Sequence, residues 1–410
     1  MPLRRVVITG MGALSPFGRG VDTLMEGFLQ GRSGVRYLPE LAAIQGMRTR
    51  VGALVPDIDP AEIPRKFRRS MSRMSVFATL AAKDASSQGG LSEEHFRDGR
   101  LGVSIGSTVG SPRTIQEFFD DFHTDHSVER MKSTLFFHIM NHSCAANVAH
   151  AFGVTGRIVS PAAACSTGCL AVGYAAEMIS MGKQDLMLCG GADEFHPLTA
   201  GTFDIMNAAS VRHNDSPGST PRPFDIGRDG VVCAEGSGIL LLESLDSALG
   251  RGAGILAEIV GFASTSDPES IANPSAARLA LCMREALRDA GVEPGEIDYV
   301  NAHATGTELG DIAESEAIFS VFGNGVPVSS LKGNIGHAMA ASGSLELAAC
   351  VEMLRRDTLL PTHNLDEIDP SCGSIRHVRE TTRLPVRTLM KNNFALGGVN
   401  SSIILRRFQR

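Results

Sequence analysis

The sequence lacks several features that mark common non-enzymatic classes of protein. It has no run of about 18 apolar residues, so no membrane-spanning helix is expected. Its first strand pattern, in MPLRRVVITGMG, follows no apolar segment of the signal-peptide kind. The eight cysteines form no CxxC pair and have no zinc-ligand spacing, which predicts reduced thiols, no metal site and a cytoplasmic protein. A net charge of −7 argues against nucleic-acid binding, so any anionic partner needs a local basic patch.

The composition is that of a glycine-rich α/β enzyme. The 410 residues include 44 glycines, 43% hydrophobic residues and 20% charged residues, enough for a large core. Strand-like apolar runs, for example 185–191, end in glycines as buried parallel strands do. A loop rich in Gly, Pro, Asp and Asn, 212–230, is predicted to lie on the surface. We divide the chain into an N-terminal half, 1–250, and a C-terminal half, 251–410.

Cys165 lies where a short strand-like run, 157–160, leads into a small-residue helix pattern ending near Gly182. Unpaired N–H groups and the positive end of the helix dipole at that position favour the thiolate form of a cysteine. The small neighbours Ala163 and Gly168 leave room for a substrate. From this stretch alone, Cys165 is either a nucleophile or a buried structural cysteine.

The polar residues of the second half follow strand-like runs. Residues 297–301 lead to His303, and residues 326–330 lead to Lys332 and His337. In α/β sheets, sites are built at strand ends. A single histidine is often a hydrogen-bonded core residue, but two at such tips, with a cysteine at a third, predict a shared catalytic site.

A cluster of cations lies in IPRKFRRSMSRM, from residue 63 to residue 74. It contains Arg65, Lys66, Arg68 and Arg69 in a chain that is acidic as a whole. Such a cluster is either a docking patch that steers an anionic partner or a solvated helix face.

Four motifs, in this order, resemble one known family. They are ACSTG at Cys165, NAHATGTELGD at His303, SSLKGNIGHAMAASGSLE at Lys332 and His337, and NNFALGGVN near the end. Over essentially its whole length the chain resembles the elongating β-ketoacyl-acyl-carrier-protein synthases. The resemblance implies a thiolase-like α/β fold, with two related halves in a five-layer αβαβα arrangement. It also implies a homodimer, or a heterodimer with a homologous subunit of the chain-length-factor kind.

The resemblance further implies a decarboxylative Claisen condensation. Cys165 would carry the acyl chain, and malonyl-carrier protein would lose CO2 beside His303 and His337, giving a β-ketoacyl chain two carbons longer in fatty-acid or polyketide/polyene biosynthesis. Lys332 would orient the His337 loop and pair with Glu346. No cofactor of its own is implied, because the phosphopantetheine belongs to the acyl carrier protein.

Binding residues are implied in the same way. The oxyanion hole would be formed by the backbone N–H groups of Cys165 and Leu396. The pantetheine arm and substrate would contact four side chains: Thr305, Thr307, Phe394 and Leu396. The four cations of the basic cluster would dock the acidic carrier protein.

One departure from the family concerns Leu396, which stands where a GFGG turn usually has phenylalanine. It leaves the acyl-chain preference open, including a specialised pathway. Two alternatives remain at this point: a malonyl-carrier-protein decarboxylase, and a non-elongating subunit that only binds the carrier protein. A thiolase is disfavoured, since FALGGVN offers no second catalytic cysteine, and a chain-initiating synthase is disfavoured by the second histidine.

Overall fold

The computed structural model describes residues 3–409. Five strands of the first half lie side by side in the order β1-β8-β7-β5-β6. Their bounds are Val6–Ser15, Gly236–Ser244, Leu186–Asp193, Leu101–Gly106 and Ile158–Val159. β1, β8 and β7 pair antiparallel, whereas β7, β5 and β6 pair parallel. The predicted buried strand at 185–191 is confirmed as β7, which is buried throughout.

The second half repeats this order as β9-β16-β15-β10-β11, with the short β13 added at its edge. Their bounds are Ala257–Ser266, Val399–Arg406, Thr388–Ala395, Tyr299–Asn301, Pro327–Ser329 and Arg376–His377. The alternation of antiparallel and parallel pairs is the same as in the first half. A short antiparallel pairing of β1 with β9 joins the two sheets. The prediction of two related halves is therefore confirmed.

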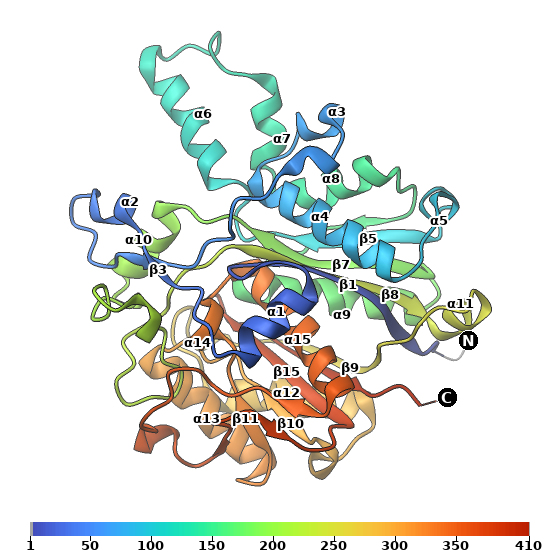
Figure 1. Cartoon of the computed structure of the whole chain (residues 1–410), viewed down its shortest axis with the longest axis vertical. Coiled ribbons are helices and arrows are strands. Elements are labelled where there is room, and N and C mark those ends of the chain that lie inside the picture. Colours follow the sequence, from blue (N-terminus) through green and yellow to red (C-terminus); the bar gives the residue numbers. More distant parts are fainter. Residues whose placement is uncertain (1–2, 410) are drawn as a thin grey trace.

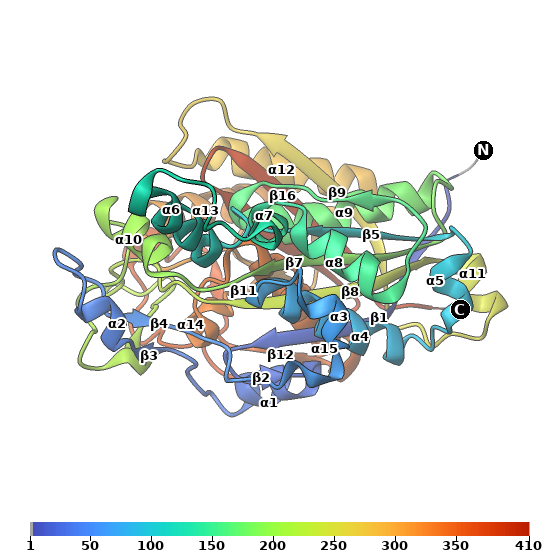
Figure 2. The same cartoon turned by 90° about the horizontal axis from the view of Figure 1, so that it is seen from above.

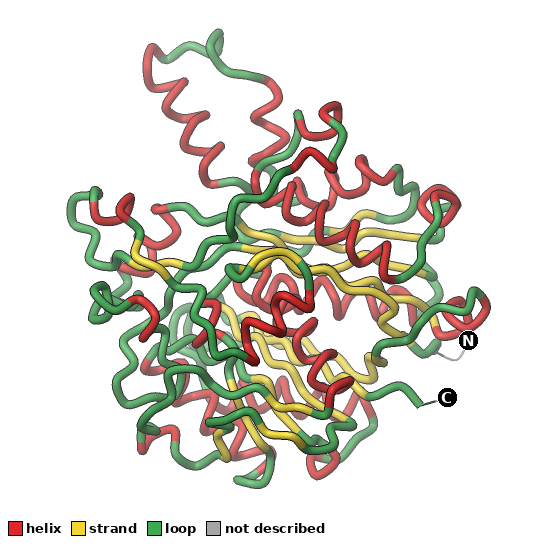
Figure 3. The backbone as a smooth tube through the Cα atoms, viewed as in Figure 1, coloured by secondary structure: helices red, strands yellow, loops and turns green. Residues whose placement is uncertain are grey.

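Helices form three layers around these sheets (Figures 1 and 3). The outer face of the first sheet is covered by α4 (Arg73–Gln88) and α8 (Ser143–Phe152), and that of the second by α12 (Ala276–Ala290) and α13 (Glu308–Phe322). Between the sheets lie α9 (Thr167–Ser180) and α15 (Ser342–Arg356), which pack on both sheets and on each other. The result is the αβαβα arrangement expected from the sequence.

The central layer is the most deeply buried part of the molecule. Every residue of α15 from Ser342 to Leu354 is buried, and its apolar side chains share one core with α9 and both sheets. Separate apolar cores lie under α4 and α8 and under α12 and α13. The helices that hold the site are thus fixed by packing on two sides.

One helical segment projects from the first half. It comprises α6 (Pro112–Asp125) and α7 (Phe136–Ile139), at the top of Figure 1, and Figure 2 looks down onto it. Its side chains are mostly exposed and include several phenylalanines. Among residues 3–409, no helix is long and apolar enough to cross a membrane.

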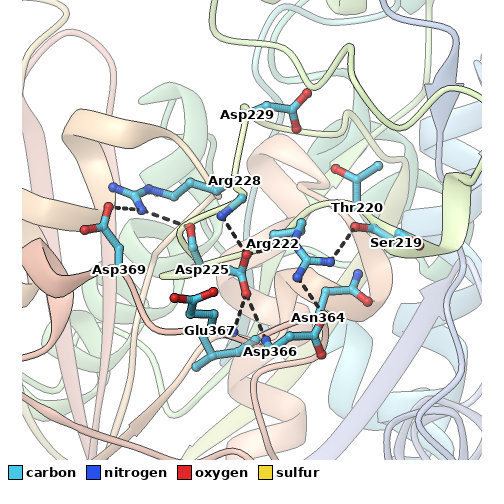
Figure 4. Close-up of polar contacts among 12 residues, drawn as sticks. Ser219, Thr220, Arg222, Asp225, Arg228, Asp229, Asn364, Asp366, Glu367 and Asp369 are labelled. Atoms are coloured by element: carbon cyan, nitrogen blue, oxygen red, sulfur yellow. Dashed lines mark hydrogen bonds and ion pairs between the residues drawn. The ribbon is translucent and has the colours of Figure 1, made fainter.

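The loop at 212–230 lies at the surface, as predicted, only in its first part, because its last ten residues are largely buried. Ion pairs and hydrogen bonds attach it to the segment 364–369 of the second half (Figure 4). The Asp225 carboxylate accepts the backbone N–H groups of Asp366 and Glu367, both at 2.9 Å. Arg222 binds Asp366 at 2.7 Å and Arg228 binds Asp369 at 2.5 Å. Several of the polar residues that suggested a surface loop instead join the two halves of the chain.

We propose the boundary between the halves at residues 250 and 251. This position is the end of α11 (Leu245–Gly250), just before β9 begins the second sheet.

Candidate active site

The site lies where four chain segments leave their strands or approach a helix. Cys165 sits in a 3₁₀ turn, Ala164–Ser166, immediately before α9. His303 follows β10, and His337 follows β11 and the short α14 (Lys332–Ile335). Leu396 follows β15. The two predicted strand tips and the cysteine turn are therefore brought together.

The three predicted catalytic side chains converge on one point. Sγ of Cys165 lies 2.8 Å from Nε2 of His337. The His303 and His337 rings meet edge to face, with centroids 5.3 Å apart. One ligating atom of each of the three residues lies within 4.8 Å of those of the other two. Cys165, His303 and His337 are thus placed to act on a single bound group.

The turns that carry these residues are held under strain. Ala164, just before the cysteine, and Met339, in the turn after His337, have φ of +44° and +49°, values that non-glycine residues rarely adopt. The Thr167 hydroxyl accepts the Ala163 N–H at 2.8 Å and fixes the first turn. A Cβ on Gly191 of β7 would lie 2.0 Å from the carbonyl oxygen of Ala340, so only glycine allows the second turn to pack there.

The Cys165 thiol is protonated in the resting site. Burial raises its pKa to about 12, although Lys332 and the backbone N–H groups of Cys165 and Leu396 act in the opposite direction. The expectation that the helix start would favour the thiolate is therefore wrong for the resting site, because desolvation outweighs the helix end. The N–H groups of Cys165 and Leu396, which are predicted to form the oxyanion hole, lower the pKa of this thiol.

Both histidines are neutral. Burial, with the nearby Lys332 and Lys391, holds the pKa of each ring well below its usual value. The Asn393 amide nitrogen donates to the Cys165 carbonyl oxygen at 3.2 Å and lies 3.3 Å from Nδ1 of His303. Since the NH2 of an amide can only donate, Nδ1 of His303 accepts here, and the proton of the His303 ring is on Nε2. The Ser342 hydroxyl holds Nδ1 of His337 at 2.8 Å.

A buried charge cluster supports the site. Nζ of Lys332 lies 2.6 Å from Oε1 of Glu346, the pair expected from the sequence. Nζ of Lys391 lies 2.6 Å from the other carboxylate oxygen of Glu346. All three side chains are 0% exposed. Burial and the second lysine lower the pKa of Lys332, and Glu346 opposes them.

Glu314 of α13 fixes the His303 loop. Its carboxylate accepts the backbone N–H groups of His303 at 2.8 Å and Ala304 at 2.7 Å. Burial raises the pKa of Glu314, while those two N–H groups, Lys391 and Lys332 lower it.

A cavity of about 470 Å³ opens in front of the sulfur. All four predicted substrate-binding residues line it: Thr305, Thr307, Phe394 and Leu396. The two threonine hydroxyls lie 3.1 Å apart, and Leu396 is 37% exposed, at the mouth. The end of the buried loop, with Arg228 and Asp229, forms part of the wall.

The predicted docking residues lie elsewhere. Arg65, Lys66 and Arg68 form α3 (Arg65–Arg68), Arg69 follows it, and none of the four lines the cavity. Arg65, Lys66 and Arg69 are exposed and Arg68 is half-buried. Within residues 3–409, none of the four forms an ion pair, whereas the neighbouring Arg73 pairs with the buried Glu235 at 2.8 Å.

Sequence reasoning missed Lys391, Asn393, Glu314 and Ser342. Lys391 and Asn393 lie in β15, where a run such as TLMKNNFA suggests polar side chains facing solvent; both are fully buried. The available signal was the run of three consecutive polar residues in a strand that leads directly into the site.

Cysteine and two histidines are also a zinc donor set, but the geometry does not fit a zinc ion. Tetrahedral zinc, with Zn–S near about 2.3 Å and Zn–N near about 2.0 Å, separates such donors by roughly 3.5 Å. The 2.8 Å between Cys165 and His337 is a hydrogen-bond distance.

Comparison with known proteins agrees with this geometry. The family model described as beta-ketoacyl synthase, N-terminal domain, matches residues 3–248, and that for the C-terminal domain matches residues 256–366. The 3-oxoacyl-[acyl-carrier-protein] synthase 1 of Escherichia coli K12 is 35% identical over 409 residues, covering 99% of this chain and 100% of that protein. Synthase 2 of Coxiella burnetii is 36% identical, covering 99% of each.

Solved structures give the same result. A beta-ketoacyl synthase from Burkholderia phymatum STM815 matches with a TM-score of 0.95 and 42% identity, over 99% of this chain and 100% of that one. The ishigamide ketosynthase/chain length factor matches with a TM-score of 0.92 and 31% identity, over 99% of this chain and 100% of that one. A type II polyketide ketosynthase in complex with its acyl-carrier protein, AntDE:AntF, matches with a TM-score of 0.91 and 30% identity, over the full length of both chains. This chain therefore belongs to the β-ketoacyl synthase family.

Proposed function

We propose that the chain condenses an acyl group held on Cys165 with a malonyl group on an acyl carrier protein, releasing CO2 and a β-ketoacyl chain two carbons longer. The observation that carries this proposal is the convergence of Cys165, His303 and His337 on one point. A nucleophile, two neutral N–H donors and an oxyanion hole are the groups that this reaction requires.

Acylation comes first. The Cys165 sulfur attacks the carbonyl carbon of the acyl thioester as its proton passes to Nε2 of His337, 2.8 Å away. The backbone N–H groups of Cys165 and Leu396 stabilise the oxyanion. When the C–S bond to the carrier breaks, the departing pantetheine thiolate takes the proton from His337, which becomes neutral again.

Decarboxylation and condensation follow on malonyl-carrier protein. When the C–C bond between the malonyl α-carbon and the carboxylate breaks, CO2 leaves, and the electrons of that bond stay on the thioester as an enolate. His303 donates its Nε2–H to the enolate oxygen, in the tautomer that Asn393 at Nδ1 favours. His337 donates there as well once its ring proton has exchanged from Nδ1 to Nε2, with Nδ1 then accepting from the Ser342 hydroxyl. The enolate carbon then attacks the Cys165 thioester, the C–S bond breaks, and the released thiolate takes a proton from solvent.

The carrier protein supplies the phosphopantetheine, which the cavity would receive past Leu396 between Thr305 and Thr307. The unpaired cations of α3 and Arg69 suit an acidic carrier protein. The ketosynthase in the AntDE:AntF structure is in complex with an acyl-carrier protein. We place the protein in the cytoplasm, since its eight cysteines all lie in the described chain, are buried and form no disulfide.

The assembly would be a dimer, with a second copy or with a homologous subunit. The edge strand β6 is unpaired on its outer side within the described chain, and its Ile158 is 49% exposed. Phe119, Phe136 and Phe137 on the projecting segment are also exposed. Unpaired edges and apolar patches of this kind are usually covered by a partner.

The test is a reconstituted reaction with acyl- and malonyl-carrier protein, followed by mass spectrometry of the carrier. A carrier-bound chain longer by one ketide unit, together with CO2, is the expected result. Release of CO2 without chain extension would show a decarboxylase instead. Binding of the carrier protein without CO2 release or chain extension would show a non-elongating subunit.

Docking is tested separately with Arg65→Glu and Lys66→Glu. Each is expected to raise the KM for the carrier protein roughly tenfold, about 1.4 kcal/mol, with little change in kcat. Arg97→Glu, an exposed cation on α5 (Glu93–Arg97), is the matched control. An equal effect in the control would contradict docking at α3.

A further inference from the structure

The end of β7 carries a buried aspartate, Asp193, that no step of the proposed reaction uses. Asp193 is 4% exposed. Its carboxylate accepts three donors: the Thr108 backbone N–H at 3.0 Å, the Thr108 hydroxyl at 2.6 Å and the Ala340 backbone N–H at 2.8 Å. Thr108 lies at the base of the projecting segment, just after β5. Ala340 lies in the turn that follows His337, so Asp193 is bonded directly to the segment that carries a catalytic side chain.

The Ala340 peptide group is clamped from three sides. Its N–H donates to Asp193, and its carbonyl oxygen packs against two glycines. A Cβ on Gly191 of β7 would lie 2.0 Å from that oxygen, and a Cβ on Gly168, in the first turn of α9, would lie 2.5 Å from it. Gly168 comes three residues after Cys165. The peptide is therefore wedged between the helix that follows the nucleophile and the strand that ends at Asp193.

The turn that contains this peptide determines where the His337 ring points. The backbone of His337 is hydrogen-bonded to the segment 232–234 through both its N–H and its carbonyl group. The ring is held at Nδ1 by the Ser342 hydroxyl, on the far side of the turn, at 2.8 Å. Between them, Met339 has φ of +49°, a conformation that persists only where the surroundings impose it. The hydrogen bond to Asp193 anchors the turn next to this residue.

We propose that Asp193 is a positioning residue for the acylation of Cys165, which anchors the Ala340 peptide so that Nε2 of His337 faces the sulfur. This inference rests on the proposed function. The thiol proton passes between Sγ and Nε2, which lie 2.8 Å apart, and a displacement of about 1 Å can slow a reaction about 100-fold. Asp193 does not line the substrate cavity, so substrate binding should not depend on it.

Three variants separate anchoring from charge and from stability. Asp193→Ala removes the acceptor for the Ala340 N–H, whereas Asp193→Asn can keep an amide oxygen at the position of the carboxylate oxygen that accepts it. Glu194→Ala is the matched control. Glu194 is also a buried carboxylate, and it accepts the Ser111 hydroxyl at 2.6 Å and the Met74 N–H at 3.2 Å, both outside the catalytic turn.

Three quantities are measured on the full chain at about pH 8. They are the rate at which iodoacetamide alkylates Cys165, located by peptide mass spectrometry, the maximal rate and half-saturating carrier concentration of Cys165 acylation by acyl-carrier protein, and Tm. Burial raises the pKa of Asp193 to about 7, although its hydrogen bonds lower it, so the carboxylate is ionised at this pH. Alkylation needs no carrier protein and therefore reports on the contact between Cys165 and His337 by itself.

For Asp193→Ala we expect slower alkylation and a maximal acylation rate about 100-fold lower, with an unchanged half-saturating concentration. Asp193→Asn should react at least as fast as wild type, although its NH2 group then faces the Thr108 N–H and lowers Tm. Glu194→Ala should lower Tm and leave both rates close to wild type. Charge alone predicts the opposite for Asp193→Ala. The Asp193 charge raises the pKa of the Cys165 thiol, so its loss would speed both reactions.

Rates in Asp193→Ala that match or exceed those of wild type would overturn the inference, as would equal losses in Asp193→Ala and Glu194→Ala. A loss in Asp193→Asn as large as that in Asp193→Ala would overturn it too. If wild-type Cys165 is alkylated but takes no acyl group from any carrier protein, the proposed function fails, and alkylation still decides whether Asp193 positions His337. Should Asp193→Ala not fold, Asp193→Ser, whose hydroxyl is too short to reach Ala340, takes its place. Failure of both to fold would make Asp193 a structural residue and would overturn the inference.

Discussion

Removal of the Glu346 carboxylate is expected to destabilise the folded protein. Glu346→Gln leaves the ammonium groups of Lys332 and Lys391, both 0% exposed, without their shared anion. Deleting one partner of a buried ion pair destabilises a protein by about 3–5 kcal/mol. With an unfolding entropy near about 2.1 cal/mol/K per residue, this lowers the Tm of a 410-residue chain by roughly 4–6 °C at pH 7.

The loss of stability in Glu346→Gln is expected to become smaller as the pH rises. Burial already lowers the pKa of Lys332, and Glu346 raises it more than Glu314 does, so the variant lowers this pKa further. Between that native value and about 10.4 in the unfolded chain, the unfolded state binds more protons, and stability therefore rises with pH. The difference in Tm between wild type and Glu346→Gln should shrink from pH 7 to pH 9.5.

Differential scanning fluorimetry at several pH values measures both effects. Glu62→Gln is the matched control, because Glu62 also binds two cations, Arg19 and Lys83, but is 46% exposed; its Tm should change little. A Glu346→Gln variant within about 1 °C of wild type at pH 7, or a deficit that is constant with pH, would refute the assignment of a buried, charged cluster.

Three further results are expected. Asn393→Ala frees Nδ1 of His303 as well as the Cys165 carbonyl, so decarboxylation should fall about tenfold, a loss of about 1.4 kcal/mol, and by more than acylation does. Equal loss of both would contradict the tautomer assignment. Leu396→Ala keeps the backbone N–H but widens the mouth of the cavity, so bulkier acyl chains should acylate Cys165 faster in a mass-spectrometric competition, and an unchanged ranking would exclude Leu396 as the gate. Because the pKa values of His303 and His337 are lowered, CO2 release should keep its full rate as the pH falls through 6.5; a half-maximal rate at 6.5 would show a protonating histidine.

The sequence predicted those parts of the site that follow from local pattern. Cys165, His303 and His337 each come within seven residues of the end of a strand-like run, and strand ends converge in α/β folds, so their meeting was foreseeable. α12 ends at Ala290, with Gly291 at φ +62° as the left-handed cap that a glycine after a helical pattern indicates. The same motifs also paired Lys332 with Glu346.

The remaining features depend on tertiary burial. β15 is covered on both faces, by α15 on one side and by the core under α12 on the other, so Lys391 and Asn393 point inward although their strand reads as polar. The sign of the Cys165 pKa shift also depends on burial, because a helix start and a dry pocket act in opposite directions. Arg222 and Arg228 pair with Asp366 and Asp369, some 140 residues further along the chain. The composition of the loop does not indicate these partners.

The central claim is that Cys165 carries the acyl chain. Intact-mass spectrometry after mixing wild type and Cys165→Ala with a panel of acyl-carrier proteins tests it directly. The account predicts one acyl adduct per chain on the wild type and none on the variant. Adducts that persist in Cys165→Ala, or a wild type that no acyl donor modifies while CO2 is still released from malonyl-carrier protein, would contradict it.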